Sequence, residues 1–210
     1  MKLLASPSSP FSRKVIMLLH EIRGLERVDI EYLDPWSVPE RLVASNPLSK
    51  VPTLILDDHR IIIDSDVICE YLDAHLPGPT LIPEPGSGDA YWHVRALEAL
   101  ANGVLEASVA ISHETRRRPE ALRWPEWVEF QQDTIRRALD VLEEQAENIA
   151  AGFDYSAICA VAALGHIDFR QTLPDWRDDR PRLAAWYQGV QLRPSVEATV
   201  PVEIFPSDSH

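Results

Sequence analysis

In the first eighty residues, the spacing of hydrophobic residues switches several times between patterns typical of strands and of helices. Four short apolar runs, one with every second residue apolar, are typical of strands in a partly buried sheet; they cover residues 3–6, 28–32, 53–56 and 61–63. Three stretches with helical spacing lie between or after them, at residues 10–23, 39–44 and 66–75. The first helix has Pro10 near its start and Gly24 just past its end, which is the usual placement of these residues. We therefore predict a small α/β domain.

The densest cluster of structure-breaking residues, 77–86, separates this part from the rest of the chain. Beyond it the periodicity is helical, and we predict helices at residues 90–117, 126–150, 156–170 and 182–191. The third of these is apolar nearly all round and should be a buried central helix. The element order of the first part is that of the thioredoxin-like fold. The predicted fold class is an α/β thioredoxin-like N-terminal domain, residues 1–78, followed by an all-α C-terminal domain, residues 86–205.

Composition and charge exclude some classes of protein. The charged fraction of 25% and the apolar fraction of 45% are those of an ordinary globular protein. No apolar run is long enough to span a membrane, so no membrane partner is expected. The net charge of −13 argues against a nucleic-acid partner, because phosphate contacts need a basic face. A small anion could still find a local positive site around Arg13, Lys14 and Lys50, or these could be solvated surface charges.

The cysteines and histidines show no pattern typical of a disulfide or of a metal site. Cys69 and Cys159 lie far apart without a paired motif and are expected to be reduced, buried thiols of a cytoplasmic protein. The N-terminus has no apolar segment long enough for a secretory signal. The seven histidines show no metal-ligand spacing, so no metal site is predicted. We expect His166, on the apolar central helix, to be a hydrogen-bonded core residue.

Ser9 is the first candidate for chemistry, because it stands just before Pro10 at the predicted start of a helix. The free N–H groups and partial positive charge at a helix start favour a thiolate. Lowering a thiol pKa of ~8.5 by about 2 units requires roughly 2.7 kcal/mol. A hydroxyl that donates to the charged sulfur supplies about 1.5–3 kcal/mol, and the helix end about 0.3–1 kcal/mol. Ser9 would thus act as a hydrogen-bond donor; alternatively, it is only an N-cap.

Three further features have the order expected of one binding site. The segment Ser9-Pro10-Phe11-Ser12 has serine at the two positions that hold cysteines in thioredoxin-like Cys-x-x-Cys sites, so dithiol redox chemistry is unavailable. Val51-Pro52, before a predicted strand, is a candidate cis-proline, with a trans loop as the alternative. Asp64 and Ser65 start a predicted helix, where Ser65 could bind a carboxylate and Asp64 an ammonium; Ser65 as an ordinary N-cap explains the pattern as well.

Together these segments resemble the glutathione S-transferases. Residues 46–52, Asn-Pro-Leu-Ser-Lys-Val-Pro, look like the family's Asn-Pro-x-x-Lys-Val-Pro segment, and residues 64–72 like its acidic-Ser-x-x-Ile-x-x-Tyr-Leu helix. The Ser-Pro-Phe start is similar to that of the serine-dependent, bacterial-type members, in which the serine activates glutathione; Ser9 matches it. The resemblance covers nearly the whole chain.

The resemblance implies glutathione as the co-substrate and a set of residues that contact it: Phe11, Lys50, Val51, Pro52, Asp64 and Ser65. It implies an electrophile pocket between the domains, for which the candidates lie on the helix through Glu106, Ala110, His113 and Arg117. It also implies a homodimer and a role in detoxification.

Two residues depart from the family pattern. Asp64 stands where most members have Glu or Gln, so its reach to the glutamyl ammonium is one methylene shorter. Asp154 takes the cap position of the central helix, and Ala157 stands where the acid of the capping box is usual, so the reciprocal bond is absent. The main hypothesis is a glutathione transferase. A non-catalytic glutathione-binding or regulatory protein on the same fold, and a glutathione-dependent isomerase, are the alternatives.

Overall fold

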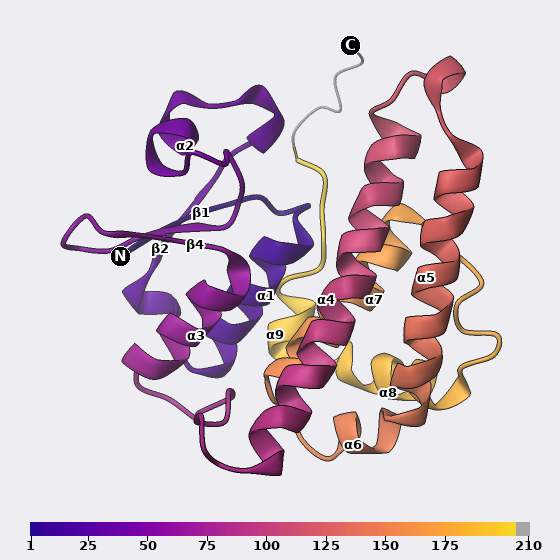
Figure 1. The fold of residues 1–210 in the computed structure, drawn as a ribbon. Helices are drawn as coiled ribbons and strands as arrows, with labels where there is room; N and C mark the ends of the chain where they lie inside the picture. Colours follow the sequence, from indigo (N-terminus) through magenta and orange to yellow (C-terminus); the bar gives the residue numbers. More distant parts are fainter. Residues whose placement is uncertain (205–210) are drawn as a thin grey trace. The chain divides into compact units, whose positions relative to one another are not determined.

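The chain divides into two compact units in the computed structural model, which describes residues 1–204 (Figure 1). The first unit comprises Met1–Ile82 together with the segment that begins at Pro194, and the second comprises Pro83–Arg193. The break at Ile82 falls within the predicted linker. The segment from Pro194 differs from the expected division, because helix α9 (Pro194–Glu197) packs on a helix of the first unit. The predicted domain end at residue 205 lies outside the described residues.

The first unit has a four-stranded sheet in the order β2-β1-β3-β4. Its strands are β1 (Lys2–Ala5), β2 (Asp29–Tyr32), β3 (Thr53–Ile55) and β4 (Ile61–Ile63). β1 is parallel to β2 and antiparallel to β3, and β3 is antiparallel to β4. The helices are α1 (Pro10–Glu21), α2 (Glu40–Ser45) and α3 (Ser65–His75), with single 3-10 turns at Leu25–Arg27 and Pro35–Ser37. This element order confirms the predicted thioredoxin-like fold.

The helices of the first unit cover both faces of the sheet, with α1 and α3 on one face and α2 on the other (Figure 1). Successive residues of a strand point to opposite faces, so Leu3 and Leu4 of β1 serve the two layers separately. Leu4 packs with Leu42 of α2 and with Val51, and all three are buried. The two-sided burial explains why β1 is a continuous apolar run rather than an alternating one.

Gly78 lies between the end of α3 and Ile82, where this part of the first unit ends. Its φ of +157° and a close approach both require glycine: a Cβ at this position would lie 2.3 Å from the backbone oxygen of Ile22. The segment that follows is tied back to α3, because Asp73 accepts hydrogen bonds from the backbone N–H groups of Leu81 (2.9 Å) and Ile82 (3.1 Å). The predicted linker is therefore ordered against the first unit up to Ile82.

The second unit is helical, and residues 83–193, all of which are described, contain no strand. Its helices are α4 (Asp89–Arg116), α5 (Pro125–Glu144), α6 (Ala146–Ala150), α7 (Tyr155–Arg170) and α8 (Pro181–Val190), with a 3-10 turn at Glu120–Leu122. Every residue of α7 from Tyr155 to Ile167 is buried, which confirms the predicted central helix. The predicted helix at 126–150 is instead two helices, because the backbone of Gln145 leaves helical geometry (φ −92°, ψ 5°).

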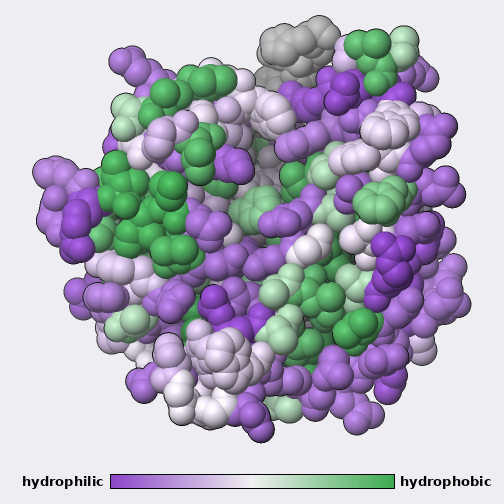
Figure 2. Space-filling model, in the orientation of Figure 1, coloured by the Kyte–Doolittle hydropathy of each residue, from purple (hydrophilic) through white to green (hydrophobic). Residues whose placement is uncertain are grey.

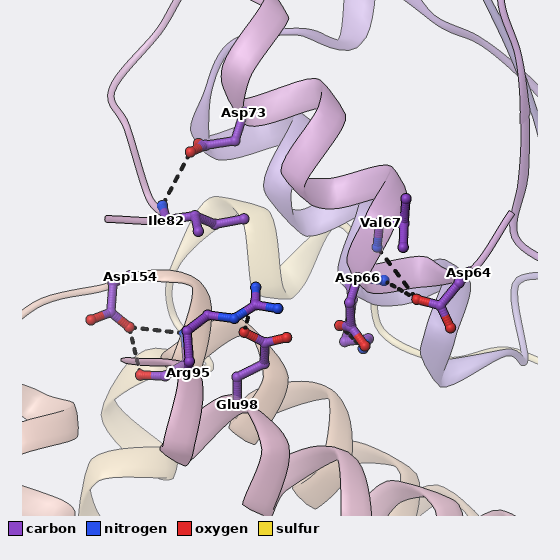
Figure 3. A network of polar contacts seen from close by, with 10 residues as sticks. Asp64, Asp66, Val67, Asp73, Ile82, Arg95, Glu98 and Asp154 are labelled. Carbon is purple, nitrogen blue, oxygen red and sulfur yellow. Dashed lines mark hydrogen bonds and ion pairs between the residues drawn. The ribbon is translucent and has the colours of Figure 1, made fainter. Parts of the chain in front are cut away.

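Asp154 caps α7, as expected from its position (Figure 3). Its Oδ1 accepts hydrogen bonds from the backbone N–H groups of Ser156 (2.9 Å) and Ala157 (3.2 Å). The hydroxyl of Ser156 donates to the same oxygen at 2.6 Å. One carboxylate oxygen of Asp154 thus accepts three hydrogen bonds in the first turn of α7.

The surface of the first unit carries an apolar patch over the edge strand β4 (Figure 2). Ile61 of β4 is 43% exposed, and Val67 of α3 is 53% exposed. An exposed apolar edge strand is a common site of pairing with another chain. Within residues 1–204, no helix is long and apolar enough to cross a membrane.

Candidate thiol-binding site

Three strand ends meet at one edge of the sheet in the first unit. Leu4 of β1 pairs with Thr53 of β3, and Thr53 pairs with Ile63 of β4, both times in antiparallel strands. The end of β1, the start of β3 and the end of β4 therefore lie beside one another. The candidate segments adjoin these ends: Ser9 follows β1, Val51 precedes β3 and Asp64 follows β4. The sheet thus brings the three sequence motifs to a common edge.

Ser9 is the N-cap of α1, with Pro10 at the first helical position. Its Oγ accepts a hydrogen bond from the backbone N–H of Ser12 at 3.2 Å, and its own N–H donates to the carbonyl of Ser6 at 3.0 Å. A hydroxyl has one proton to donate and two lone pairs. Capping uses one lone pair, so the Ser9 proton can still be donated to an anion. The two interpretations of Ser9, as a cap and as a thiol-binding donor, are therefore compatible.

The neighbouring serines are placed differently from Ser9. Ser12 is fully buried, and its Oγ accepts a hydrogen bond from the backbone N–H of Ser6 at 3.2 Å. This bond ties the loop after β1 to the first turn of α1. Ser6 is itself buried, and its Oγ lies 3.4 Å from that of Ser8. Ser9 is half-buried at the helix end, which makes it the best placed of these hydroxyls to receive a ligand.

The Val51–Pro52 peptide bond is cis, as expected from the sequence. The buried side chain of Asn46 holds the loop before it. Its Nδ2 donates to the carbonyl of Lys50 and to Oγ1 of Thr53, both at 3.0 Å, and its Oδ1 accepts from the backbone N–H of Leu48 at 2.9 Å. The sequence analysis assigned no role to Asn46. The signal was its place at the head of the family segment, four residues before Lys50.

Asp64, rather than Ser65, is the N-cap of α3 (Figure 3). Its Oδ1 accepts hydrogen bonds from the backbone N–H groups of Asp66 (2.9 Å) and Val67 (3.3 Å). The expectation that Ser65 caps this helix is wrong, because Ser65 is the first helical residue and is buried. Asp64 has a φ of +74°, a region that costs a non-glycine residue on the order of 1–3 kcal/mol and is often found at functional sites.

Lys14 connects the two helices that begin at this edge. Its side chain is fully buried on α1, and its Nζ lies 2.6 Å from Oδ1 of Asp66 on α3. The same ammonium lies 5.7 Å from the centre of the Phe11 ring. The ion pair therefore fixes the starts of α1 and α3 relative to each other, and with them Ser9 and Ser65. The sequence signals no such role, because most lysines are exposed.

The local positive site suggested by Arg13, Lys14 and Lys50 does not form. Arg13 is buried, where its Nε donates to Oγ1 of Thr199 and its Nη2 to the carbonyl of Val196, both at 3.4 Å. It holds the segment around α9 against α1. Lys14 is committed to Asp66. Of the three basic residues, Lys50 is the exposed one.

The candidates for the electrophile lie along α4 in the second unit, with Arg117 as the C-cap residue of this helix. Glu106, Ala110, His113 and Arg117 follow one another at helical spacing, and all but the half-buried Ala110 are exposed. The pKa of His113 is lowered, first by desolvation and then by the positive charges of Arg117 and Arg170. Glu114, on the buried side, accepts hydrogen bonds from Arg118 and from the backbone N–H of Trp124, both at 2.8 Å.

His166 is a hydrogen-bonded core histidine, as expected. Its Nδ1 lies 2.8 Å from Oγ of Ser108 on α4, and that hydroxyl lies 2.8 Å from Oγ1 of Thr172. Burial, followed by the charges of Arg170 and His113, lowers the pKa of His166 to about 3. The imidazole is therefore neutral at physiological pH and acts as a structural link between α4 and α7.

Within residues 1–204, no group of three or more His, Cys, Asp or Glu side chains is arranged to hold a metal ion. Cys69 and Cys159 are both buried thiols.

Models of the two domains of one protein family match the two units. Residues 8–75 match the model of the glutathione S-transferase N-terminal domain, and residues 125–189 that of the C-terminal domain. An uncharacterised GST-like protein of Escherichia coli K12, YibF, is 32% identical over 204 residues, which cover 96% of this chain and 98% of that protein.

Solved structures include two of a glutathione transferase family member from Pseudomonas fluorescens. One, with bound glutathione, is 43% identical, covers 96% of this chain and 99% of the other, and has a TM-score of 0.90. The other, with bound S-(propanoic acid)-glutathione, is 42% identical, covers 97% and 100% of the two chains, and has a TM-score of 0.87. The chain therefore belongs to the glutathione S-transferase family.

Proposed function

We propose that this protein is a glutathione transferase that activates the thiol of glutathione for attack on an electrophilic small molecule. The observation that carries the proposal is the state of Ser9. Its hydroxyl caps α1 as an acceptor and keeps a proton for donation, at the sheet edge where Val51 and Asp64 also lie. Ser9 is the proposed catalytic residue, as the donor to the glutathione thiolate.

The remaining contacts to glutathione are proposed by family resemblance and are consistent with the same edge of the sheet. Val51 would pair with the cysteinyl unit through its backbone, and Lys50, which is exposed, would meet the tripeptide with its ammonium. Ser65 would bind the γ-glutamyl carboxylate at the start of α3. Asp64 would bind the glutamyl ammonium, and since its Oδ1 is used in capping, its Oδ2 is the oxygen we assign to this role. Phe11 and Pro52 would complete the site.

The similar solved structures support glutathione as a ligand of this protein, and the transfer reaction rests on the site itself. The Pseudomonas fluorescens protein binds glutathione and also a glutathione that carries a propanoic acid group on sulfur. At 42–43% identity over nearly the whole chain, the same ligand class is the best supported one for this protein. The second unit would supply the electrophile site, with Glu106, Ala110, His113 and Arg117 as its proposed residues.

Ser9→Ala tests the proposal directly. A thiol with pKa ~8.5 is ~3% ionised at pH 7, and full activation to about 75% gains only ~25-fold. We expect turnover of a chromogenic aryl halide to fall by about tenfold at pH 7 and the deficit to shrink towards pH 9, where the thiol ionises unaided. Glutathione affinity should change little.

Ser8→Ala is the matched control, because it removes a neighbouring hydroxyl that does not cap α1. It should retain wild-type turnover. A Ser9→Ala variant with unchanged turnover and an unchanged pH profile would refute the role of Ser9. Retention on immobilised glutathione without transfer to any of a broad set of electrophiles would favour the non-catalytic binding protein instead. Reversible addition without a conjugate product would favour the isomerase.

We further propose that the protein works as a homodimer in the cytoplasm, in detoxification. The edge strand β4, with Ile61 43% exposed, supports self-association, because an unpaired sheet edge can pair with a second copy of the chain. Light scattering coupled to size-exclusion chromatography measures the oligomeric state. A monomer at micromolar concentration would contradict the dimer and leave the thiol site untouched.

A further inference from the structure

The segment that follows α9 returns to the start of α1 within the first unit (Figure 1). It comprises residues 198–204, Ala-Thr-Val-Pro-Val-Glu-Ile, and is called the return segment below. The backbone N–H of Val202 donates a hydrogen bond to the carbonyl of Pro7 at 3.4 Å. Pro7 stands two residues before Ser9. The return segment therefore lies beside the loop that carries the proposed catalytic hydroxyl.

Two side chains of α1 hold the beginning of the return segment. Nε of Arg13 donates to Oγ1 of Thr199, and Nη2 of the same guanidinium donates to the carbonyl of Val196. Oγ1 of Thr199 in turn donates to the carbonyl of Ser195 at 2.8 Å. The hydroxyl of Ser195, which is buried, donates to the carboxylate of Glu21. The return segment thus begins at a defined place on α1.

The two contacts of the return segment lie on either side of Ser9 along the chain. Pro7 comes two residues before Ser9, and Arg13 comes four residues after it. Val200 and Pro201 connect the two contacts, so they pass the start of α1. The residue before a proline avoids helical geometry, which favours an extended path here. A sulfur that accepts the Ser9 proton would lie at the same helix start.

Two apolar side chains of the return segment are accessible at this place. Val200 is 58% exposed and Val202 is 47% exposed. Their backbone is held on both sides by the contacts to α1 and to Pro7. An apolar group that covered these two side chains would remove their surface from water, which favours binding.

We infer that Val200 and Val202 form an apolar wall beside the glutathione sulfur and contact the group that becomes attached to it, so that the return segment selects for electrophiles with an apolar reacting end. The transfer reaction joins this group directly to the sulfur, so its first carbons must lie near Ser9. The inference rests on the proposed function, because it assigns a specificity determinant of that reaction.

Two S-alkyl glutathiones test the wall without requiring turnover. S-methylglutathione and S-hexylglutathione share the tripeptide and differ only in the length of the alkyl chain. Isothermal titration should show that the wild type binds the hexyl compound about tenfold more tightly. The double variant Val200→Thr, Val202→Thr replaces a methyl group by a hydroxyl at each position, with little change in volume. It should reduce the preference for the hexyl compound by about three- to fivefold, while binding of the methyl compound changes little.

Val43→Thr is the matched control. Val43 is 44% exposed, which is close to the value for Val202, and it lies on α2, on the other face of the sheet from α1 (Figure 1). This variant should keep the wild-type preference for the hexyl compound. All the substituted side chains are exposed, so the fold should be kept, and circular dichroism verifies this for each variant.

The possible outcomes separate the inference from the proposed function. A double variant with the wild-type preference would overturn the inference while leaving the proposed function in place, and so would a wild type that binds both compounds equally. An equal loss of preference in Val43→Thr would overturn it too, since a general change of the surface would then suffice. If the double variant loses affinity for glutathione itself as much as for the hexyl compound, the return segment serves the tripeptide, and the inference fails. No binding of glutathione or of either conjugate by the wild type would overturn the proposed function as well.

Discussion

Each unit contains a buried polar link between two helices, and the two links differ in chemistry. In the first unit an ion pair, Lys14 to Asp66, joins α1 to α3. In the second, a neutral network of Ser108, His166 and Thr172 joins α4 to α7. The ion pair lies next to the helix starts at the thiol-binding edge, and the network joins α4, which carries the proposed electrophile residues, to α7.

The charged link and the neutral link differ in their sensitivity to substitution and to pH. A buried ion pair is costly to desolvate, and its main energetic signature is the penalty for removing one partner. A neutral network has a smaller penalty for each lost bond, but it is sensitive to protonation, because a charged imidazole in the core is unfavourable. The first unit should therefore be vulnerable to substitution, and the second to acid.

Asp66→Asn should have the largest effect on stability. It replaces the charge that faces a fully buried ammonium with a neutral amide, and such half-broken buried pairs lose about 3–5 kcal/mol. Urea denaturation at pH 7 measures the loss. Asp58→Asn is the matched control: it breaks the exposed pair with Arg60, and its denaturation midpoint should hardly move.

The double variant Lys14→Met, Asp66→Leu sharpens this test. With both charges removed, the desolvation cost disappears along with the attraction, so much of the stability lost in Asp66→Asn should return. Equal stability of Asp66→Asn and the wild type would show that the pair contributes nothing. If the double variant is instead less stable than Asp66→Asn, the attraction within the ion pair stabilises the unit by more than the desolvation of the two charges costs.

Acid should destabilise the second unit through His166. Its pKa is about 3 when folded and ~6.5 when unfolded, so below pH 6.5 the unfolded state binds the proton and the folded state does not. The stability from the neutral imidazole is complete above pH 6.5 and is lost as the pH falls towards 3. At pH 5 the loss is about 2 kcal/mol.

A comparison of wild type with His166→Gln isolates this contribution. The free energy of unfolding is measured at pH 7 and at pH 5 for both proteins, so that the other titrating groups cancel in the difference. The wild type should lose about 2 kcal/mol more than the variant over this range. Equal losses would mean that His166 does not carry the pH dependence.

The fold was predictable where local patterns decide the structure. The apolar runs gave the strands, Pro10 marked the first helix start, and the all-apolar stretch gave the central helix α7. The cis peptide bond at Val51–Pro52 and the core role of His166 were also predicted. These features depend on residue type and near neighbours, which a single sequence contains.

The structural roles that were not predicted depend on partners distant in sequence or on a choice between equivalent residues. Lys14 was expected either in a local positive site or as a solvated surface charge, because its partner, Asp66, is brought to it only by the packing of α1 on α3. Asp64 and Ser65 are both good caps, and sequence alone does not choose between adjacent caps. The sequence analysis named no partner for His166, because Ser108 lies on another helix, 58 residues away in the chain.

Ser108→Ala should give the smallest effect and completes the comparison. It removes the hydroxyl between His166 and Thr172, and loss of a buried neutral hydrogen bond costs about 1–2 kcal/mol, well below the value for Asp66→Asn. Urea denaturation at pH 7 measures it, with Thr115→Val as the control, since that hydroxyl bonds only within α4, to the carbonyl of Ile111. If Ser108→Ala proved as damaging as Asp66→Asn, the distinction between a charged and a neutral link would fail.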